Sequence, residues 1–410
     1  MKKAHLEWHV LLLVTLALVA FGLVMVYSAT SAPAALGGGD PTGYLARQGV
    51  YALIGLCLLA VAARTDFRIW RKLAPPFLVA SFALCVAVLA LGDPINGARR
   101  WLAVGPAVFQ PSELAKLALA IWASAYLARR RAPQTLAELA KPIGFVAGVF
   151  CALILLEPDL GTVVVLVVML GGLLLVAGTP VRLLGTAGAI AAAVGGAAIW
   201  IEPYRRARVL SFMNPWDDAQ GAGFQSVQAL IGLGSGGLFG KGLGQGVQKI
   251  FYLPEAHTDM IFAIVGEELG LIGSTLVIAA YGAFAYAGLQ VALRCADPFG
   301  KRLAASLTAL VCGQAAVNLA AVLGLAPLTG IPLPFVSAGG SSLVVMLTGV
   351  GVLLNIASNG GRKLAAVPDR GRGDGRPRAA RARDSGSAPR ARSGGDVRRV
   401  AGARRGSARR

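Results

Sequence analysis

A group of titratable residues lies where a polar segment of the sequence runs into an apolar one, in the stretch FYLPEAHTDMIFAIVGEELG. The polar part contains Glu255, His257 and Asp259, and the apolar part contains Glu267 and Glu268. Carboxylates and imidazoles are the side chains that most often take or give protons in catalysis. Because charge is costly inside a bilayer, acids at the mouth of an apolar helix indicate either a functional site or an internal ion pair.

The spacing of three of these acids divides them into two classes. On an ideal α-helix Glu267 lies about 80° around the axis from Asp259, and Glu268 lies about 180° around. The three carboxylates therefore cannot face one site, and at least one of the deeper two must pack against protein rather than lipid. We predict that Glu267 and Glu268 are structural and that Asp259 is the candidate for chemistry. Taken alone, Asp259 is also typical of a helix N-cap and His257 of an interfacial histidine.

A second group of charged residues lies in the stretch GARRWLAVGPAVFQPSELAK, which contains Arg100, Glu113 and Lys116. Pro111 followed closely by an acid is typical of the first turn of a helix. Glu113 and Lys116 are three residues apart, so they share a helix face and can form an ion pair. The alternative is that Arg100 and Lys116 lie beside an anionic ligand at the outer surface.

Two short connections also gather charged side chains. The motif LEPDLGT places Glu157 and Asp159 around a proline, which fits either a turn with solvated acids or an acid pair that holds a cation in a cavity. The motif YRRARVLSFMNPWDD contains Arg205 and Arg206 among aromatic residues. Such a cluster is usual at a membrane boundary, and it also suits the phosphate of a lipid headgroup.

Two segments are irregular yet apolar. Residues Ile231–Gly246 read IGLGSGGLFGKGLGQG, with eight glycines but without the spacing of a P-loop. A phosphate-binding loop, a flexible loop and a re-entrant backbone beside a cavity all stay open for it. Residues Pro327–Ser342 read PLTGIPLPFVSAGGSS, which is typical of segments that enter a membrane beside a cavity or contact a partner.

Composition excludes an ordinary soluble domain. The 410 residues are 56% hydrophobic and only 14% charged, with a mean hydropathy of +0.65. Of the net charge of +19, residues 361–410 carry 16 Lys and Arg against 4 Asp and Glu, a net of +12. The basicity is therefore a tail, predicted to be disordered and to attract anionic lipid, rather than a nucleic-acid-binding face. The five cysteines lie mainly in apolar runs and predict no disulfide framework.

The elements that must position these residues are transmembrane helices, each of which needs about 20 apolar residues. About ten spans are predicted, so the fold class is an all-α polytopic membrane protein with a large outer loop between spans seven and eight. The predicted spans are Val10–Tyr27, Gln48–Ala63, Leu73–Leu91, Leu114–Leu127, Ile143–Leu156, Thr162–Ala177, Leu183–Ile201, Asp259–Leu289, Leu303–Leu325 and Ser342–Ile356. The N-terminal run is expected to be a retained first span rather than a cleaved signal.

Lys and Arg in the alternate connections predict that both termini are cytoplasmic and that Asp259 lies on the outer side. The long outer loop runs against this rule because it contains five cations, Arg205, Arg206, Arg208, Lys241 and Lys249. We expect these cations to have a task there.

The motifs together resemble the SEDS family (shape, elongation, division and sporulation) of the FtsW/RodA type. The matching stretches occur in family order: GARRWL with FQPSELAK, LLEPDLGT, FMNPWDD, QSVQALIGLGSGGLFGKGLG, YLPEAHTDMIFAIVGEELG and PLTGIPLPFVSAGGSS. They cover most of Met1–Ile356, the predicted membrane domain is residues 1–360, and the forms PEAHTD and GEELG are closer to the division branch. The segment 361–410 is outside the shared pattern.

The resemblance implies a peptidoglycan glycosyltransferase that polymerises lipid II at the outer face of the bacterial cytoplasmic membrane. The family's essential aspartate falls on Asp259, which would take the proton from the acceptor sugar hydroxyl. Basic side chains, or a divalent cation such as Mg²⁺ or Mn²⁺, would stabilise the diphosphate, and no organic cofactor is expected. The candidate substrate-binding residues are Arg100, Lys116, Arg205, Arg206, Lys241 and Lys249, and the near-site residues are Glu113, Glu255 and His257.

The resemblance also implies the partners: a class B penicillin-binding transpeptidase and other membrane proteins of the division complex at the septum. The strongest rival function is a flippase for the lipid-linked precursor, because spans, a cavity and intramembrane acids suit transport as well. A structural membrane scaffold is the third alternative.

Overall fold

The computed structural model describes residues 2–35, 41–95, 98–105, 107–250, 253–254 and 256–360. The Arg-rich segment 361–410 lies outside the described residues. Its predicted disorder, its binding of anionic lipid and the division of the chain at residue 360 therefore stay predictions.

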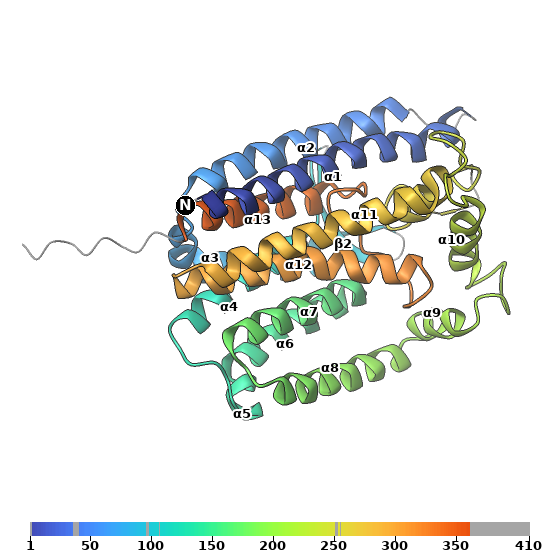
Figure 1. Cartoon of the computed structure of the whole chain (residues 1–410). Helices are drawn as coiled ribbons and strands as arrows, with labels where there is room; N and C mark the ends of the chain where they lie inside the picture. Colours follow the sequence, from blue (N-terminus) through green and yellow to red (C-terminus); the bar gives the residue numbers. More distant parts are fainter. Residues whose placement is uncertain are drawn as a thin grey trace, which may run out of the picture. The chain divides into compact units, whose positions relative to one another are not determined.

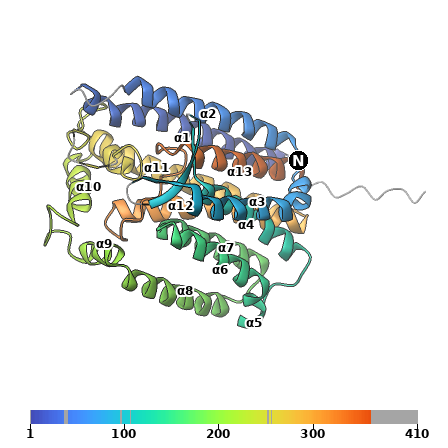
Figure 2. The same cartoon turned by 180° about the vertical axis from the view of Figure 1, so that it is seen from behind.

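Long apolar helices dominate the described part of the chain and run side by side (Figure 1 and Figure 2). They are α1 (Lys2–Ala35), α2 (Pro41–Arg64), α3 (Arg68–Leu91), α4 (Pro111–Ala128), α6 (Phe145–Leu156), α7 (Leu160–Ala177), α8 (Val181–Ile201), α11 (Ile261–Arg294), α12 (Pro298–Val322) and α13 (Gly340–Asn359). Nine of the helical segments in the described ranges are long and apolar enough to cross a membrane. The prediction of an all-α polytopic membrane protein is confirmed, and all five cysteines are free.

The tenth predicted span, Leu114–Leu127, lies within α4. This helix packs against α3 and α12, inside the bundle. The helix α4 is not among the nine apolar segments because two of its 18 residues, Glu113 and Lys116, are charged and lower its mean hydropathy.

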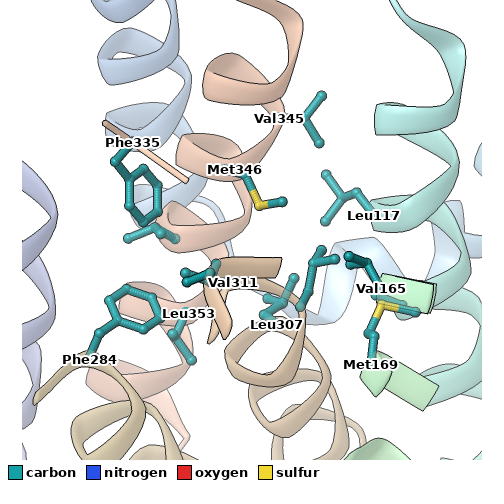
Figure 3. Close-up of a cluster of buried hydrophobic side chains, with 14 of the residues drawn as sticks. Leu117, Val165, Met169, Phe284, Leu307, Val311, Phe335, Val345, Met346 and Leu353 are labelled. Carbon is teal, nitrogen blue, oxygen red and sulfur yellow. The ribbon is translucent and has the colours of Figure 1, made fainter. Parts of the chain in front are cut away.

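Burial divides the spans into a central and a peripheral group. In the most apolar 18-residue stretch of each helix, the share of residues buried inside the protein is 67% for α11, 67% for α12 and 72% for α13. For α8 the same share is 0%. Figure 3 shows part of the shared core, to which Leu117 of α4, Met169 of α7, Phe284 of α11, Leu307 of α12 and Met346 of α13 contribute. The central helices therefore form the rigid support for whatever they carry at their ends.

Shorter elements occupy the connections. The helices α5 (Leu136–Leu139) and α9 (Pro203–Met213), the π-helical turn η1 (Ala140–Gly144) and α10 (Phe224–Ser235) join the spans, and α10 stands across one end of the bundle in Figure 1. A small antiparallel sheet, which the sequence did not predict, consists of β1 (Asp93–Ile95), β2 (Ala98–Val104) and β3 (Ala107–Phe109). The predicted outer loop between spans three and four is thus a folded platform that carries Arg100 on β2.

The helix α11 is interrupted at Gly270, whose φ of 65° is outside the helical range. The interruption frees backbone groups, and the glycine-rich segment after α10 pairs with them: the amides of Lys241 and Gly242 donate to the carbonyls of Glu267 and Glu268 at 3.0 Å. A Cβ at Gly240 would lie only 2.1 Å from the Glu268 carbonyl oxygen, so this close approach requires glycine. The segment is therefore not a free loop but a backbone that lies against a broken helix, and phosphate binding by it stays a prediction.

Candidate functional site

Asp259 lies in the turn that leads into α11. The residue at the N-cap position of α11 is Met260, so Asp259 does not occupy the N-cap position that the sequence suggested for it. The Asp259 side chain is half-buried, and its Oδ1 accepts a hydrogen bond from Thr258 Oγ1 at 3.2 Å. A half-buried carboxylate can meet both protein and a bound ligand.

The irregular segment Pro327–Ser342 forms a wall beside this turn. A Cβ at Gly330, which has a φ of 70°, would lie 3.9 Å from Asp259 Oδ2, so the segment passes directly against the carboxylate. At the other end of the turn the amide of Ala338 donates to the carbonyl of His257 at 2.9 Å. A motif that was weakly specific in the sequence is therefore part of the site.

Two amide side chains that the sequence reasoning missed hold this wall in place. Asn318 Nδ2 donates to the carbonyls of Asp259 at 2.7 Å and Ile331 at 2.8 Å. Gln314 Nε2 donates to the carbonyl of Pro332 at 2.9 Å. Both lie on α12, four residues apart and fully buried, so they share one helix face. Two amides at this spacing inside an apolar span were the signal in the sequence that would have revealed them.

Lys116 is buried and belongs to the same network. Its Nζ donates to Glu113 Oε1 at 2.8 Å and to Gln314 Oε1 at 2.6 Å, while its side chain is 0% exposed. The ion pair between Glu113 and Lys116 confirms the internal-pair interpretation, and Pro111 begins α4 as expected. Lys116 reaches the wall of the site through Gln314, so it supports Pro332 rather than presenting its charge at the surface.

The motif LEPDLGT packs on the other side of the wall, because a Cβ at Gly161 would lie 2.8 Å from the carbonyl oxygen of Thr329. Asp159 caps α7 by accepting from the Thr162 amide at 2.9 Å and also accepts from Gln110 Nε2 at 3.3 Å. With Glu157 0% and Asp159 4% exposed, the prediction of solvated acids is wrong.

The surroundings of Glu157 favour the neutral form of its carboxyl, and cation binding by the acid pair of this motif stays a prediction. Burial raises the pKa of the Glu157 carboxyl to about 8, the charge of Asp159 adds to this shift, and Arg100 opposes it. Neither carboxyl oxygen of Glu157 has a hydrogen-bond partner in the described part of the chain. Arg100 donates instead to the backbone carbonyls, from Nε to Glu157 O at 2.8 Å and from its Nη2 to Pro158 O.

Lys241 and Lys249 neutralise the two deep carboxylates. Lys241 Nζ lies 2.8 Å from Glu267 Oε1, and Lys249 Nζ lies 2.7 Å from Glu268 Oε1. Glu268 also accepts from Ser28 Oγ of α1 at 2.7 Å. Glu267 and Glu268 are therefore structural, as predicted, and two of the five outer-loop cations have an internal task.

The same two carboxylates hold the backbone of the glycine-rich segment. Glu267 accepts hydrogen bonds from the amides of Val247 at 2.9 Å and Gln248 at 3.0 Å. The amide of Gly246 donates to Glu268 at 3.3 Å. Acids inside α11 thus fix the segment that precedes the Asp259 turn.

The remaining predicted residues lie around this region or outside the description. Arg206 is exposed on α9, 6.0 Å from the ring centroid of Trp200. The ring of His257 makes an edge contact with Tyr44 of α2 at 5.4 Å. Glu255 and the side chain of Arg205 lie outside the described residues. Substrate contact by any of the predicted residues stays a prediction.

Few side chains at this site could coordinate a divalent cation. Within the described ranges no three Asp, Glu, His or Cys side chains gather as a metal site. Mg²⁺ commonly binds through one or two carboxylates together with substrate phosphates and water. Asp259 fits that donor set, so a cation held by Asp259 and by a substrate diphosphate agrees with the residues present.

Comparisons with known proteins agree with this arrangement. The family model of the FtsW/RodA/SpoVE cell cycle proteins matches residues 8–361. A protein of Geobacter sulfurreducens named probable peptidoglycan glycosyltransferase FtsW is 41% identical over 352 residues, which are 85% of this chain and 94% of the relative. A protein of the same name from Mycobacterium bovis is 41% identical over 366 residues, which are 88% of this chain and 70% of the relative.

Solved structures share the fold. A chain of a peptidoglycan synthase complex that coordinates polymerization and crosslinking superposes with a TM-score of 0.72 at 32% identity, and the match covers 86% of this chain and 98% of that one. The rod shape determining protein RodA of Thermus thermophilus superposes with a TM-score of 0.64 at 29% identity, covering 86% and 97%.

Proposed function

The chain belongs to the FtsW/RodA/SpoVE family of cell cycle proteins, and we propose that it polymerises lipid II at the outer face of the cytoplasmic membrane. The predicted enzyme class, a peptidoglycan glycosyltransferase, is confirmed by the names of its curated relatives. Lipid II as the substrate and septal wall synthesis as the setting are the finer parts of the proposal. The observation that carries it is Asp259, a half-buried carboxylate held against Gly330 at the start of the most buried group of helices.

In the proposed reaction Asp259 acts as the general base. It takes the proton of the acceptor sugar's 4-hydroxyl as that oxygen forms a bond to the anomeric carbon of the donor. The bond from that carbon to the diphosphate breaks, the diphosphate leaves with the electron pair, and the anomeric configuration inverts. Because a diphosphate is a good leaving group, one carboxylate suffices here, unlike the acid and base pair of glycosidases.

In this proposal arginine is the first group that stabilises the negative charge of the departing diphosphate. Arg206 is exposed on α9 and has the bidentate geometry that suits phosphate. Lys116, Lys241 and Lys249 already neutralise carboxylates, so we assign them positioning roles. A divalent cation held by Asp259 would supply further positive charge beside the diphosphate.

The chain's proposed partner is a class B penicillin-binding transpeptidase. The support is the likeness to a chain that is solved within a peptidoglycan synthase complex. Both termini on the cytoplasmic side, as the distribution of Lys and Arg predicts, would place Asp259 on the side where lipid II is polymerised.

The decisive experiment is polymerisation of purified lipid II by the full chain together with its transpeptidase. Asp259→Asn keeps the size of the side chain and removes the base, so we expect the rate to fall by about 10² to 10⁴. Asp93→Asn, at an exposed carboxylate on β1, is the matched control and should polymerise at the wild-type rate.

Binding of the transpeptidase and the unfolding temperature should be unchanged in Asp259→Asn. Wild-type polymerisation by this variant would overturn the role of Asp259. A wild-type chain that moves lipid-linked precursor across liposomes without making polymer would overturn the enzyme proposal in favour of a flippase.

A further inference from the structure

A basic cavity lies between α3 and α4. It has a volume of ≈ 250 Å³, and the side chains of Arg71, Trp122, Tyr126, Arg129 and Arg130 line it. The other end of α4 meets the Asp259 region through Gln110 and Asp159. Because α4 rises by 1.5 Å per residue, its two ends are about 27 Å apart. The cavity therefore belongs to the opposite end of the bundle from the proposed active site.

The sequence of the two helices explains why there is space here. Pro75 lies inside α3 and lines the cavity. Proline has no N–H, so this turn of α3 lacks the backbone hydrogen bond to the carbonyl of Arg71. On α4 the rings of Trp122 and Tyr126 stack at 5.7 Å and form one wall. Between these groups the small side chains of Ala74 and Ala125 leave a gap.

The arginines of this cavity lack acidic partners in the described part of the chain. Other arginines at the same end are paired: Arg68 with Asp66 and Asp297, and Arg294 with Glu7. No described carboxylate lies within salt-bridge distance of Arg71, Arg129 or Arg130. Three guanidinium groups that converge without compensation indicate a site for an anion.

The helix dipoles explain only part of this charge. Arg129 and Arg130 follow the C-terminus of α4, where positive charge is favourable. Arg71 lies in the first turns of α3, near the positive end of that helix dipole, where a cation is unfavourable without a nearby anion. Arg130 also lies 4.9 Å from the ring centroid of Tyr126, which holds its guanidinium in place while its N–H edges stay available.

We propose that this cavity binds the phosphate of an anionic phospholipid headgroup. The three arginines bind the phosphate oxygens, and Trp122 and Tyr126 lie at the level of the glycerol, as aromatic residues do at membrane interfaces. The acyl chains then run along the apolar surface of α3, where Val79, Phe82 and Val86 are exposed and follow Pro75 on the same helix face. Basic cavities between transmembrane helices are suited to lipid headgroups in this way. None of the residues that line the site belongs to the polybasic segment 361–410.

The test is native mass spectrometry of the full chain after delipidation and addition of defined lipids. The wild-type chain should retain phosphatidylglycerol in preference to zwitterionic phosphatidylethanolamine. The triple variant Arg71→Gln, Arg129→Gln and Arg130→Gln should weaken phosphatidylglycerol binding at least about tenfold, because each arginine near the headgroup contributes to the attraction. The control Arg64→Gln, Lys72→Gln and Arg131→Gln removes the same charge from exposed residues outside the cavity and should bind within about twofold of wild type.

Equal losses in the two triple variants would overturn the site in favour of a general basic surface, and so would no loss in either. Soluble glycerol phosphate is the second probe: if it binds as well as the lipid, the ligand is a soluble phosphate compound and the lipid assignment is wrong. The single change Arg129→Gln, at an exposed side chain, gives the same test with a smaller loss and little risk to folding.

Discussion

Asp259 and Glu268 are carboxylates nine residues apart in one stretch of sequence, yet the protein treats them in opposite ways. Glu268 is 0% exposed, and Lys249 and Ser28 surround it. Asp259 is half-buried, and Asn318 donates a hydrogen bond to its backbone carbonyl at 2.7 Å. A fully enclosed and neutralised carboxylate fixes structure, whereas a half-buried one beside the wall segment can also be reached by a ligand.

A third carboxylate, Glu157, shows another way to tolerate burial. It has no lysine partner, and its pKa is raised to about 8, so it is neutralised by a proton. The two enclosed acids thus differ in what compensates their burial, a lysine for Glu268 and a proton for Glu157, while Asp259 is only half-buried. This difference predicts different responses to substitution and to pH.

The largest effect on stability is expected at the pair formed by Glu268 and Lys249. Glu268→Ala leaves the ammonium of Lys249, 1% exposed, without its partner, which should lower the free energy of unfolding by about 3–5 kcal/mol. Denaturant unfolding of the purified chain measures it. The double variant with Lys249→Ala should be no less stable than either single variant, and a fully additive loss would contradict the pairing.

A pH dependence is expected from Glu157. Its folded pKa of about 8 exceeds the model value of 4.5, so the folded state binds more protons between these values and stability falls as pH rises from 4.5 to about 8. Glu157→Gln should remove this component of the slope. Unfolding temperatures measured across the window check it, and an unchanged slope in the variant would show that Glu157 is already ionised.

A smaller loss of stability, but a selective loss of activity, is expected at Asn318. Asn318→Leu leaves the carbonyls of Asp259 and Ile331 without their donor, which should lower the free energy of unfolding by about 1–3 kcal/mol.

The matched control is Asn355→Leu, because Asn355 is a buried amide that bonds to Ala63 and Phe67 away from the Asp259 turn. Both variants should lose stability, but only Asn318→Leu should lose polymerisation under conditions where the chain is fully folded. Equal activities would mean that Asn318 does not position the site.

The smallest effect is expected at Lys241, whose side chain is 34% exposed. Lys241→Ala should lower the free energy of unfolding by about 1 kcal/mol, because partly exposed pairs are weak and Glu267 keeps the amides of Val247 and Gln248. Denaturant unfolding compares it directly with Lys249→Ala. If the two substitutions lower the free energy of unfolding equally, burial of an ion pair does not determine how much it stabilises this protein.

Much of the arrangement was local enough to be predicted from the sequence. The length of the apolar runs predicted the membrane helices, and residue spacing set Asp259 at the outer mouth apart from the deeper Glu267 and Glu268. The predicted helical angles between them do not apply, because Asp259 lies in the turn before α11. The pair of Glu113 with Lys116 was also predictable from residue spacing. The small sheet that carries Arg100 was missed, since its strands are only three to seven residues long.

Only the tertiary structure decided which residues meet. Ser28 and Glu268 are 240 residues apart, and no local pattern reports such a contact. In the sequence, the glycines of the 236–246 segment fit a flexible loop as well as a packed backbone. The structure decides between the two, because the interruption of α11 at Gly270 frees the backbone groups against which the glycines pack. Sequence spacing thus identified Asp259 as the acid that stands apart, while long-range packing decided which cations are already occupied by other acids and which wall the carboxylate faces.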